Sequence, residues 1–297
     1  MEHTDTDRSI SVMGIVNLTD NSYFASSRCL TPAGEVDMDM AMNRTARMLE
    51  EGADIIDIGA CSTRPGSQPV GAEEEWRRLG PFLKQVRRTF GDGIRISVDT
   101  YWASVVQRCF DTIGDFIIND ISAGEDDPDM LPTAGRLGLE YVAMHKRGTP
   151  ATMQTLCQYG DVTQDVLDYF TEFGKRAASH GITRWILDPG FGFAKTVEQN
   201  YELLSRLDRF LQAGRPILVG ISRKSMIYRL LDITPEEALP QTQVLHLAAL
   251  ERGASVLRVH DVAEAVRTVR IWRMLNGAAG QPATGQTPTR QCPPPGR

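Results

Sequence analysis

Short apolar runs alternate with longer amphipathic segments along most of this chain. The runs are rich in Ile and Val and mostly continuous, which is typical of parallel strands covered on both faces. They predict eight strands, at residues 12–16, 55–58, 94–98, 116–118, 141–144, 185–187, 216–219 and 256–259. Between them, apolar positions at helical spacing predict helices at residues 36–51, 73–90, 101–110, 161–180, 198–211 and 262–275.

Strands alternating with helices predict an α/β fold, and we expect a single-domain (β/α)8 barrel. A doubly wound parallel sheet shows the same alternation and is the competing architecture. The folded body is expected at residues 11–276, which suits one barrel of about 250 residues. Residues 1–10 are polar and are expected to form an N-terminal extension. Residues 277–297 are rich in Gly, Pro and Thr and are expected to form a disordered tail.

Composition narrows the classes of partner. The formal net charge of −6 argues against broad nucleic-acid binding through phosphate neutralisation. No apolar run approaches the roughly 18 residues of a membrane span, so no membrane partner is expected. The first ten residues lack the apolar segment of a signal peptide, and we therefore predict a cytoplasmic protein. The five cysteines are far apart, so neither a disulfide framework nor a zinc site is expected.

Polar or glycine-containing signatures follow nearly every predicted strand. They are Asn17, the segment 59–64, Asp99, Asn119 with Asp120, His145, Asp188, Ser222 to Lys224, and Arg258 to Asp261. In a barrel the carboxyl ends of the strands build the active site. Helix capping explains any one of these residues as well, since Asp and Asn often begin the next helix. Eight strand ends of this kind are harder to explain by capping alone.

Eight segments carry a resemblance to a known family. They are MGIVNLT (13–19), DIGACSTRPG (57–66), SVDTY (97–101), IINDIS (117–122), MHKRG (144–148), LDPGFGFAKT (187–196), VGISRKS (219–225) and RVHDV (258–262). In order and spacing the chain resembles the bacterial dihydropteroate synthases from about residue 12 to residue 269. The resemblance implies a (β/α)8 barrel that joins para-aminobenzoate to 6-hydroxymethyl-7,8-dihydropterin pyrophosphate, making dihydropteroate and pyrophosphate in folate synthesis. It also implies a sulfonamide target, because sulfonamides mimic aminobenzoate.

The resemblance assigns pterin-binding positions to residues at the strand ends. They are Asp99, Asn119, Met144, Asp188 and Lys224. The residue types suit the ring, because a carboxylate accepts two N–H donors and a carboxamide can both donate and accept. Without the resemblance, Asp188 before Pro189–Gly190 would be better explained as a turn residue. The alternative for Lys224, a surface charge on the first turn of a helix, is less favoured because residues 222–224 directly follow a predicted buried strand.

For the pyrophosphate, the resemblance points to Asn17, Thr63, Arg64, Arg258 and His260. Arg258 and His260 are two residues apart on one strand and so share a face. The alternative for His260 is a core histidine followed by a helix-capping Asp261. A pyrophosphate leaving group favours Mg²⁺, with Asn17 as an oxygen ligand of the metal. The catalytic set is then Arg64, Asp99, Lys224, Arg258 and His260, acting by dissociative displacement without a covalent enzyme intermediate.

The aminobenzoate needs a flat slot and a partner for its carboxylate. By resemblance, Tyr23, Phe24 and Pro65 flank the ring and Ser225, at an expected helix N-terminus, lies near the carboxylate. The chain departs from the common family pattern at several positions: Asp20 replaces Pro, Asn21 replaces an acidic residue and Tyr23 replaces Phe. Ala60 stands where Gly is frequent, Cys61 where Glu is frequent, and Gln199 where His is frequent.

Two other functions share the pterin pocket. A methyltetrahydrofolate-binding methyltransferase barrel needs no pyrophosphate clamp, so the SRKS and RVHDV segments count against it. For a non-catalytic pterin-binding homologue, Asn21 is the one positive hint. The family further implies a homodimer, for which the helix at 262–275 offers Ile271, Trp272 and Leu275. These three side chains could equally pack on the barrel.

Overall fold

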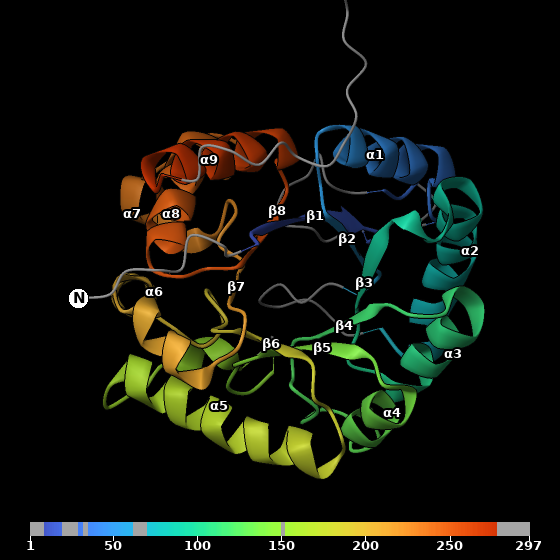
Figure 1. Cartoon of the computed structure of the whole chain (residues 1–297), viewed down its shortest axis with the longest axis horizontal. Helices are drawn as coiled ribbons and strands as arrows, with labels where there is room; N and C mark the ends of the chain where they lie inside the picture. The colour runs from blue at the N-terminus through green and yellow to red at the C-terminus, as the bar shows by residue number, and fades with distance from the viewer. Residues whose placement is uncertain (1–8, 20–28, 32–34, 62–69, 150–151, 278–297) are drawn as a thin grey trace, which may run out of the picture.

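Eight parallel strands form a ring in the computed structural model, which describes residues 9–19, 29–31, 35–61, 70–149 and 152–277 (Figure 1). The strands are β1 (Ser11–Asn17), β2 (Ile55–Gly59), β3 (Arg95–Asp99), β4 (Ile117–Asp120), β5 (Glu140–Met144), β6 (Trp185–Asp188), β7 (Leu218–Val219) and β8 (Val256–Val259). Their order is β6-β5-β4-β3-β2-β1-β8-β7, and a single bridge between Leu187 and Ile217 joins β6 to β7. An open doubly wound sheet would leave two free edges, so the barrel prediction is confirmed.

The helices surround this ring (Figure 1). They are α1 (Met38–Glu50), α2 (Ala72–Phe90), α3 (Ala103–Ile113), α4 (Met130–Leu137), α5 (Val162–Ser179), α6 (Val197–Ser205), α7 (Ser225–Leu231), α8 (Leu239–Glu251) and α9 (Val262–Leu275), with short 3-10 segments η2 (Gly91–Gly93), η3 (Met153–Thr155) and η4 (Leu207–Ala213). Within the described residues, no helix is long and apolar enough to cross a membrane.

Helix prediction failed at three short or weakly patterned segments and at one break. α4 and α7 span only eight and seven residues, too few for a clear apolar stripe. α8 has buried residues but almost no amphipathic pattern, because its sequence is apolar on more than one side. The helix predicted at 198–211 instead ends at Ser205 and continues as the 3-10 segment Leu207–Ala213.

The barrel interior is filled in layers. The lower layer is an apolar cluster of one residue from each of seven strands: Met13, Ile55, Ile117, Val142, Ile186, Leu218 and Val256. Side chains two residues further along a strand point to the same side. The next interior layer therefore contains Asp57, Asn119, Met144, Asp188 and Arg258. An apolar plug closes the lower part of the barrel, and polar groups occupy the level above it, toward the carboxyl ends of the strands.

Candidate active site

The carboxylate of Asp57 on β2 accepts hydrogen bonds from side chains of three other strands, and the Asp57 side chain is fully buried. Its Oδ2 accepts a hydrogen bond from Nε of Arg258 on β8 at 2.7 Å. Its Oδ1 accepts one from the Ser97 hydroxyl at 2.6 Å, and Nδ2 of Asn119 lies 3.2 Å from both carboxylate oxygens. A buried carboxylate needs this degree of pairing, because leaving it unpaired costs several kcal/mol. Four strands, β2, β3, β4 and β8, thus contribute to one charged network at the barrel mouth.

Arg258 also joins Asp57 to Asp99. Its Nη2 donates to Oδ2 of Asp99, at the end of β3, at 2.8 Å. Burial lowers the pKa of the Arg258 guanidinium, but the charges of Asp57 and Asp99 outweigh it and hold that pKa above its usual value. Burial raises the pKa of Asp99 to about 7, although Arg258 opposes the shift. The mouth therefore contains a firmly charged arginine beside a carboxyl group that gains a proton unusually easily.

Asp188 closes β6 and pairs in register with Met144 at the end of β5. Its Oδ1 accepts a hydrogen bond from the Gly190 amide at 2.8 Å, so the turn role considered for Asp188 is real. Asp188 nevertheless also faces the site. Burial raises the pKa of Asp188, and the opposing effects come first from Lys224 and then from the Gly190 amide and Arg258. One carboxylate oxygen can orient the turn while the other is free for a ligand.

Lys224 does not lie on the surface as the alternative interpretation had it. It precedes α7, and its Nζ donates to the carbonyl of Phe191 at 2.6 Å. Nζ also lies 4.9 Å from the centre of the Phe193 ring. Burial lowers the pKa of Lys224 to about 8, and Asp188 opposes that shift. The ammonium group thus faces a carboxylate and the ring of an aromatic side chain.

Phe193 belongs to a small apolar cluster at the mouth. Its other members are Ile121, Met144, Met153 and Ala194, with Tyr101 packed against them. Met144 is 3 % exposed and Phe193 is 8 % exposed. This cluster gives the otherwise charged mouth one apolar wall, beside Asp188 and Lys224.

His260 and Ser222 meet between β7 and β8. Nδ1 of His260 lies 3.0 Å from the Ser222 hydroxyl, which also accepts a hydrogen bond from the His260 amide at 3.3 Å. Burial, together with the positive charge of Arg44, lowers the pKa of His260 to about 3. The imidazole is therefore neutral at pH 7. Of the other predicted residues, Asn17 ends β1 and Ser225 is the first residue of α7.

Asp261 does not cap α9 with its side chain, although it occupies the capping position. Its carboxylate instead accepts two hydrogen bonds from Arg223, at 2.8 and 3.0 Å. Arg223 also donates to the carbonyls of Pro235 and Glu236, and its backbone φ of +54° lies in the left-handed region. This pairing ties the segment before α7 to the end of β8, and it places Ser222 and Lys224.

Several predicted residues lie outside the described residues: Tyr23, Phe24, Thr63, Arg64 and Pro65, together with the departures at Asp20 and Asn21. Two other departures can be placed. The Cys61 sulfur lies 3.9 Å from the Tyr101 hydroxyl, and burial raises the pKa of the thiol. Gln199 forms a capping box with Thr196 at the start of α6, and its amide also donates to the Cys157 carbonyl.

A Mg²⁺ ion would have few protein ligands here. In the part of the chain that the structure describes, no group of three His, Cys, Asp or Glu side chains is arranged to hold a metal. Asn17 at the mouth supplies one amide oxygen, a ligand type suited to a hard cation. Mg²⁺ usually binds through one or two protein ligands plus substrate phosphates, so this donor set fits an ion delivered with the pyrophosphate.

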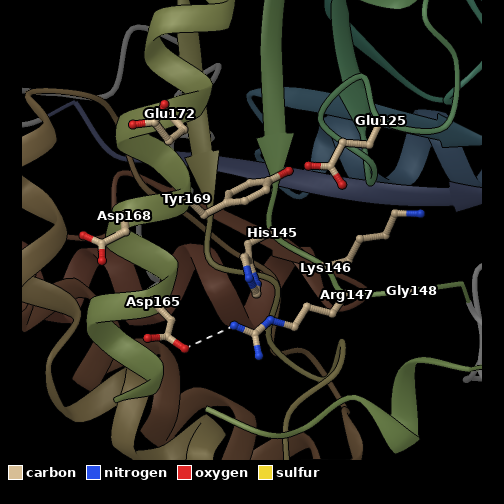
Figure 2. A pocket seen from close by; sticks show the side chains of 9 residues that line it. All are labelled: Glu125, His145, Lys146, Arg147, Gly148, Asp165, Asp168, Tyr169 and Glu172. Atoms are coloured by element: carbon tan, nitrogen blue, oxygen red, sulfur yellow. Dashed lines mark hydrogen bonds and ion pairs between the residues drawn. The ribbon is translucent and has the colours of Figure 1, made fainter. Parts of the chain in front are cut away.

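A separate cavity of about 520 Å³ lies outside the barrel, between the end of β5 and α5 (Figure 2). Its lining residues are Glu125, His145, Lys146, Arg147, Gly148, Asp165, Asp168, Tyr169 and Glu172. None of them is a predicted substrate-binding residue. Arg147 is paired with Asp165 at 3.1 Å, as the dashed line shows.

Sequence reasoning missed four residues that the structure places at the mouth: Asp57, Ser97, Phe193 and Lys195. Asp57 and Ser97 are polar residues inside buried strands, two positions from an inward-facing position, and this signal could have identified them. Phe193 and Lys195 lie within the LDPGFGFAKT segment, but nothing in its local pattern distinguishes an inward side chain from an outward one.

Comparison with known proteins agrees with this geometry. Residues 13–260 match a family of pterin-binding enzymes. Dihydropteroate synthase of Haemophilus influenzae is 40 % identical over 264 residues, covering 88 % of this chain and 92 % of that protein. The Escherichia coli K12 enzyme of the same name is 40 % identical over 262 residues, covering 88 % and 89 %.

Solved structures give the same result. Yersinia pestis dihydropteroate synthase, solved with a sulfonamide drug complex, superposes with a TM-score of 0.84 at 35 % identity and covers 93 % of this chain and 96 % of that one. The Xanthomonas albilineans enzyme, solved with 4-aminobenzoic acid, has a TM-score of 0.81 at 35 % identity and covers 91 % and 94 %. A barrel whose mouth is lined by Asp57, Asn119, Asp188 and Arg258, in a chain this similar to those enzymes, belongs to the dihydropteroate synthase family.

Proposed function

We propose that this enzyme condenses para-aminobenzoate with 6-hydroxymethyl-7,8-dihydropterin pyrophosphate at the mouth of its barrel, giving 7,8-dihydropteroate and pyrophosphate. One observation carries the assignment of the site. Asp57, Asp99, Asn119, Asp188 and Arg258 come from five strands and meet at the barrel mouth, above the apolar lower layer. A ring with several N–H donors and ring acceptors, attached to an anionic group, matches this set of acceptors and cations.

The pterin ring is placed with its donor edge on Asp188. The Asp188 oxygen not used by the turn accepts from the ring, and Lys224 donates to a ring acceptor. Asn119 uses its amide nitrogen for Asp57, which leaves its amide oxygen to accept from the ring. Met144 forms an apolar surface beside Asp188. Asp57 acts indirectly, because its carboxylate orients the side chains of Asn119 and Arg258.

The pyrophosphate is placed near Arg258 and His260. Arg258 supplies the fixed positive charge, and His260 contributes a neutral N–H donor, because its pKa of about 3 keeps the ring uncharged in the free enzyme. Thr63 and Arg64 are proposed to act from the second loop. Asn17 would hold a Mg²⁺ ion, which would supply positive charge to the leaving group.

The aminobenzoate is placed beside the apolar wall. Phe193 and Lys224 together offer a ring face and a positive charge, and Ser225 lies next to Lys224 in the chain. Tyr23, Phe24 and Pro65 are proposed to cover the other side. The Xanthomonas albilineans relative was solved with 4-aminobenzoic acid, which supports an aminobenzoate site in this barrel type. Sulfonamides are expected to compete for it, and the Yersinia pestis relative was solved with such a drug.

The proposed reaction is a loose displacement. The bond from the pterin methylene carbon to the pyrophosphate oxygen breaks first, and the amine nitrogen then forms the new C–N bond and loses a proton. The electron-rich ring and the nearby carboxylates of Asp99 and Asp188 stabilise the developing positive charge. No protein nucleophile is needed, so catalysis consists of positioning and electrostatic stabilisation.

The test is a reconstitution. Purified protein is mixed with Mg²⁺, dihydropterin pyrophosphate and aminobenzoate, and both pyrophosphate and dihydropteroate are measured. Equal amounts of both products are expected, with much less from Arg258→Ala and wild-type amounts from Lys175→Met, an exposed lysine on α5. If neither product exceeds the enzyme-free control, the proposal is wrong, and pterin binding without turnover would favour a non-catalytic homologue.

We also propose a homodimer formed through α9 and the adjoining part of α8. Ile271, Met274 and Leu275 are exposed on α9, and Val244 is exposed on α8. α8 and α9 are neighbours, since Thr268 donates to Gln243 at 2.8 Å. Trp272, which we had included in this surface, instead packs against the barrel core. A cytoplasmic location stays a prediction from the sequence.

A further inference from the structure

Lys195 is a buried cation that the proposed reaction does not use. It lies between β6 and α6 and is only 3 % exposed. Its Nζ lies 3.0 Å from Nδ1 of His145, 3.0 Å from the Gly190 carbonyl and 3.1 Å from the Phe193 carbonyl. An ammonium group has three donors, and here each donor has one acceptor. This complete pairing indicates that the surrounding residues are arranged to hold the Lys195 ammonium group.

The loop that Lys195 binds carries part of the proposed active site. It follows Asp188 and includes Phe193. Gly190 and Gly192 have positive φ angles, and so does Ala194, at +49°. Such a backbone conformation is unfavourable for alanine and persists only when surrounding bonds enforce it. Two lysines supply such bonds, because the partly buried Lys224 holds the Phe191 carbonyl while the buried Lys195 holds those of Gly190 and Phe193.

His145 fixes the other side of Lys195. The ring is 2 % exposed and stands edge-on to Tyr169, with centroids 4.9 Å apart. Figure 2 shows it between Tyr169 and Arg147, at the wall of the outer cavity. Burial and the charge of Lys195 lower the pKa of His145 well below its usual value, so Nδ1 of the neutral ring can accept from the ammonium. A Cβ atom on Gly190 would lie 2.0 Å from the His145 carbonyl, so the loop is pressed against the end of β5.

Lys195 is also linked to Asp188 through Gly190, because Nζ of Lys195 donates to the Gly190 carbonyl and the Gly190 amide donates to Oδ1 of Asp188. Asp188 is the largest influence that favours the charged form of Lys195, against a burial effect that lowers the pKa of Lys195 to about 7. The charged groups facing Asp188 are the cations Lys224, Arg258 and Lys195, from three different segments, and the carboxyl group of Asp99. Lys224 and Arg258 are assigned to substrate in the proposed reaction. Of these three cations, Lys195 is the one whose ammonium donors all bind acceptors in the protein.

We propose that Lys195 is a positioning residue for pterin binding: it holds the loop 189–194 against His145 and, while protonated, supplies a positive charge that keeps Asp188 ionised. This inference rests on the pterin-binding role proposed for Asp188. Lys195 touches neither substrate. It sets the geometry of Phe193 and the charge of Asp188, and the rim of the outer cavity at His145 is connected to the active site through it.

The test measures binding of 6-hydroxymethylpterin by calorimetry between pH 6 and pH 8.5, with the full-length protein. This probe lacks the pyrophosphate, and its own ionisation is common to all variants. Lys195→Met is expected to weaken binding about tenfold at pH 6, where the Asp188 carboxyl most needs the cation, and by a smaller factor at pH 8.5, where the wild-type lysine has itself lost its charge. Lys175→Met is the matched control and should bind like the wild type.

A purely structural role would weaken binding by the same factor at every pH, and that result would overturn the proposal. In an Asp188→Asn background, Lys195→Met should lose its pH-dependent part, because there is no carboxylate left to protect; persistence of that part would also overturn it. Lys195→Arg keeps the charge and should bind like the wild type at pH 6, where the wild-type lysine is also charged. If circular dichroism shows that Lys195→Met is unfolded, the arginine variant is used instead, and weakened binding at pH 6 in the folded arginine variant refutes the proposal.

These outcomes are separate from a failure of the proposed function. If the wild-type protein binds no pterin, or if Asp188→Asn binds as well as the wild type, the assignment of the pterin site is wrong. If Asp188→Asn loses binding while Lys195→Met behaves like the wild type at all pH values, the pterin site stands and only the role of Lys195 is refuted.

Discussion

Arg258 and Asp57 are 201 residues apart in the chain, and Nε of the arginine lies 2.7 Å from Oδ2 of the aspartate. They lie on β8 and β2, which are separated in the barrel by β1 alone. The same guanidinium also binds Asp99 on β3. The residue predicted to hold the pyrophosphate is therefore neutralised by two carboxylates in the absence of substrate. An incoming pyrophosphate has to compete with Asp57 and Asp99 for this arginine.

Arg258→Ala is expected to lower both stability and activity. It leaves the fully buried Asp57 without its cation, which costs about 3 kcal/mol in the free energy of unfolding. Urea unfolding measures this loss. Adding Asp57→Asn should recover part of it, since the uncompensated charge is then gone. If Arg258→Ala alone is as stable as the wild type, the ion pair between Arg258 and Asp57 is not formed in solution.

Asp188→Asn is expected to weaken pterin binding roughly 10- to 100-fold, because hydrogen bonds to an ionised group contribute about 1.5–3 kcal/mol each. Asparagine can still accept from the Gly190 amide, so the turn should persist and the thermal midpoint should change little. Calorimetry with dihydropterin pyrophosphate is the measurement. Unchanged affinity would place the pterin elsewhere.

Loss of the positive charge of Lys224 is expected to set the alkaline limit of substrate binding. Its pKa of about 8 is below the ordinary 10.5, so the folded enzyme loses this charge as pH rises through about 8. The Michaelis constant for dihydropterin pyrophosphate should rise above that pH, whereas Lys224→Arg, which stays charged, should show no such rise up to about pH 9.5.

Loss of the Lys224 proton does not destabilise the fold, so unfolding does not account for this limit. A group whose pKa is lower in the folded state adds stability as pH rises through the window from about 8 to 10.5. Thermal melts across this window should therefore show no loss caused by Lys224. If the Michaelis constant of Lys224→Arg rises in parallel with that of the wild type, another group sets the limit.

Ile271→Glu is expected to convert a dimer into a monomer, because it places a charge in the apolar surface of α9. Size-exclusion chromatography with light scattering gives the mass directly. Leu230→Glu on α7 is the matched control, since Leu230 is 56 % exposed and Ile271 is 57 % exposed. A wild-type protein that runs as a monomer at high concentration, or a dimer that persists in Ile271→Glu, contradicts the proposed interface.

Most of the fold could be predicted because its signals are local. All eight strands appear where continuous Ile- and Val-rich runs stand, and the long helices α1, α2, α5 and α9 have clear apolar stripes or capping residues. α8 could not be predicted in the same way, because a helix packed on several sides has no single apolar face. The boundaries of β7 and α6 depend on the elements packed against them, and the ranges predicted from the sequence for these two elements were too long.

The candidate site divides in a similar way. The polar strand ends and their resemblance to one family indicate Asp99, Asn119, Asp188, Lys224 and Arg258 as site residues, and the structure brings these five to one mouth. The sequence did not reveal that Arg258 is already paired, that His260 is neutral, or that Asp261 serves Arg223 rather than its own helix.

The sequence by itself determined which stretches become strands and which residue types stand at their ends, because periodicity and local chemistry are properties of neighbouring residues. Only the tertiary structure decided which charges meet, as for Asp57 with Arg258 and for Lys195 with His145. Such pairs join distant segments, and their energy depends on burial and distance. Those two quantities exist only once the barrel has closed around them.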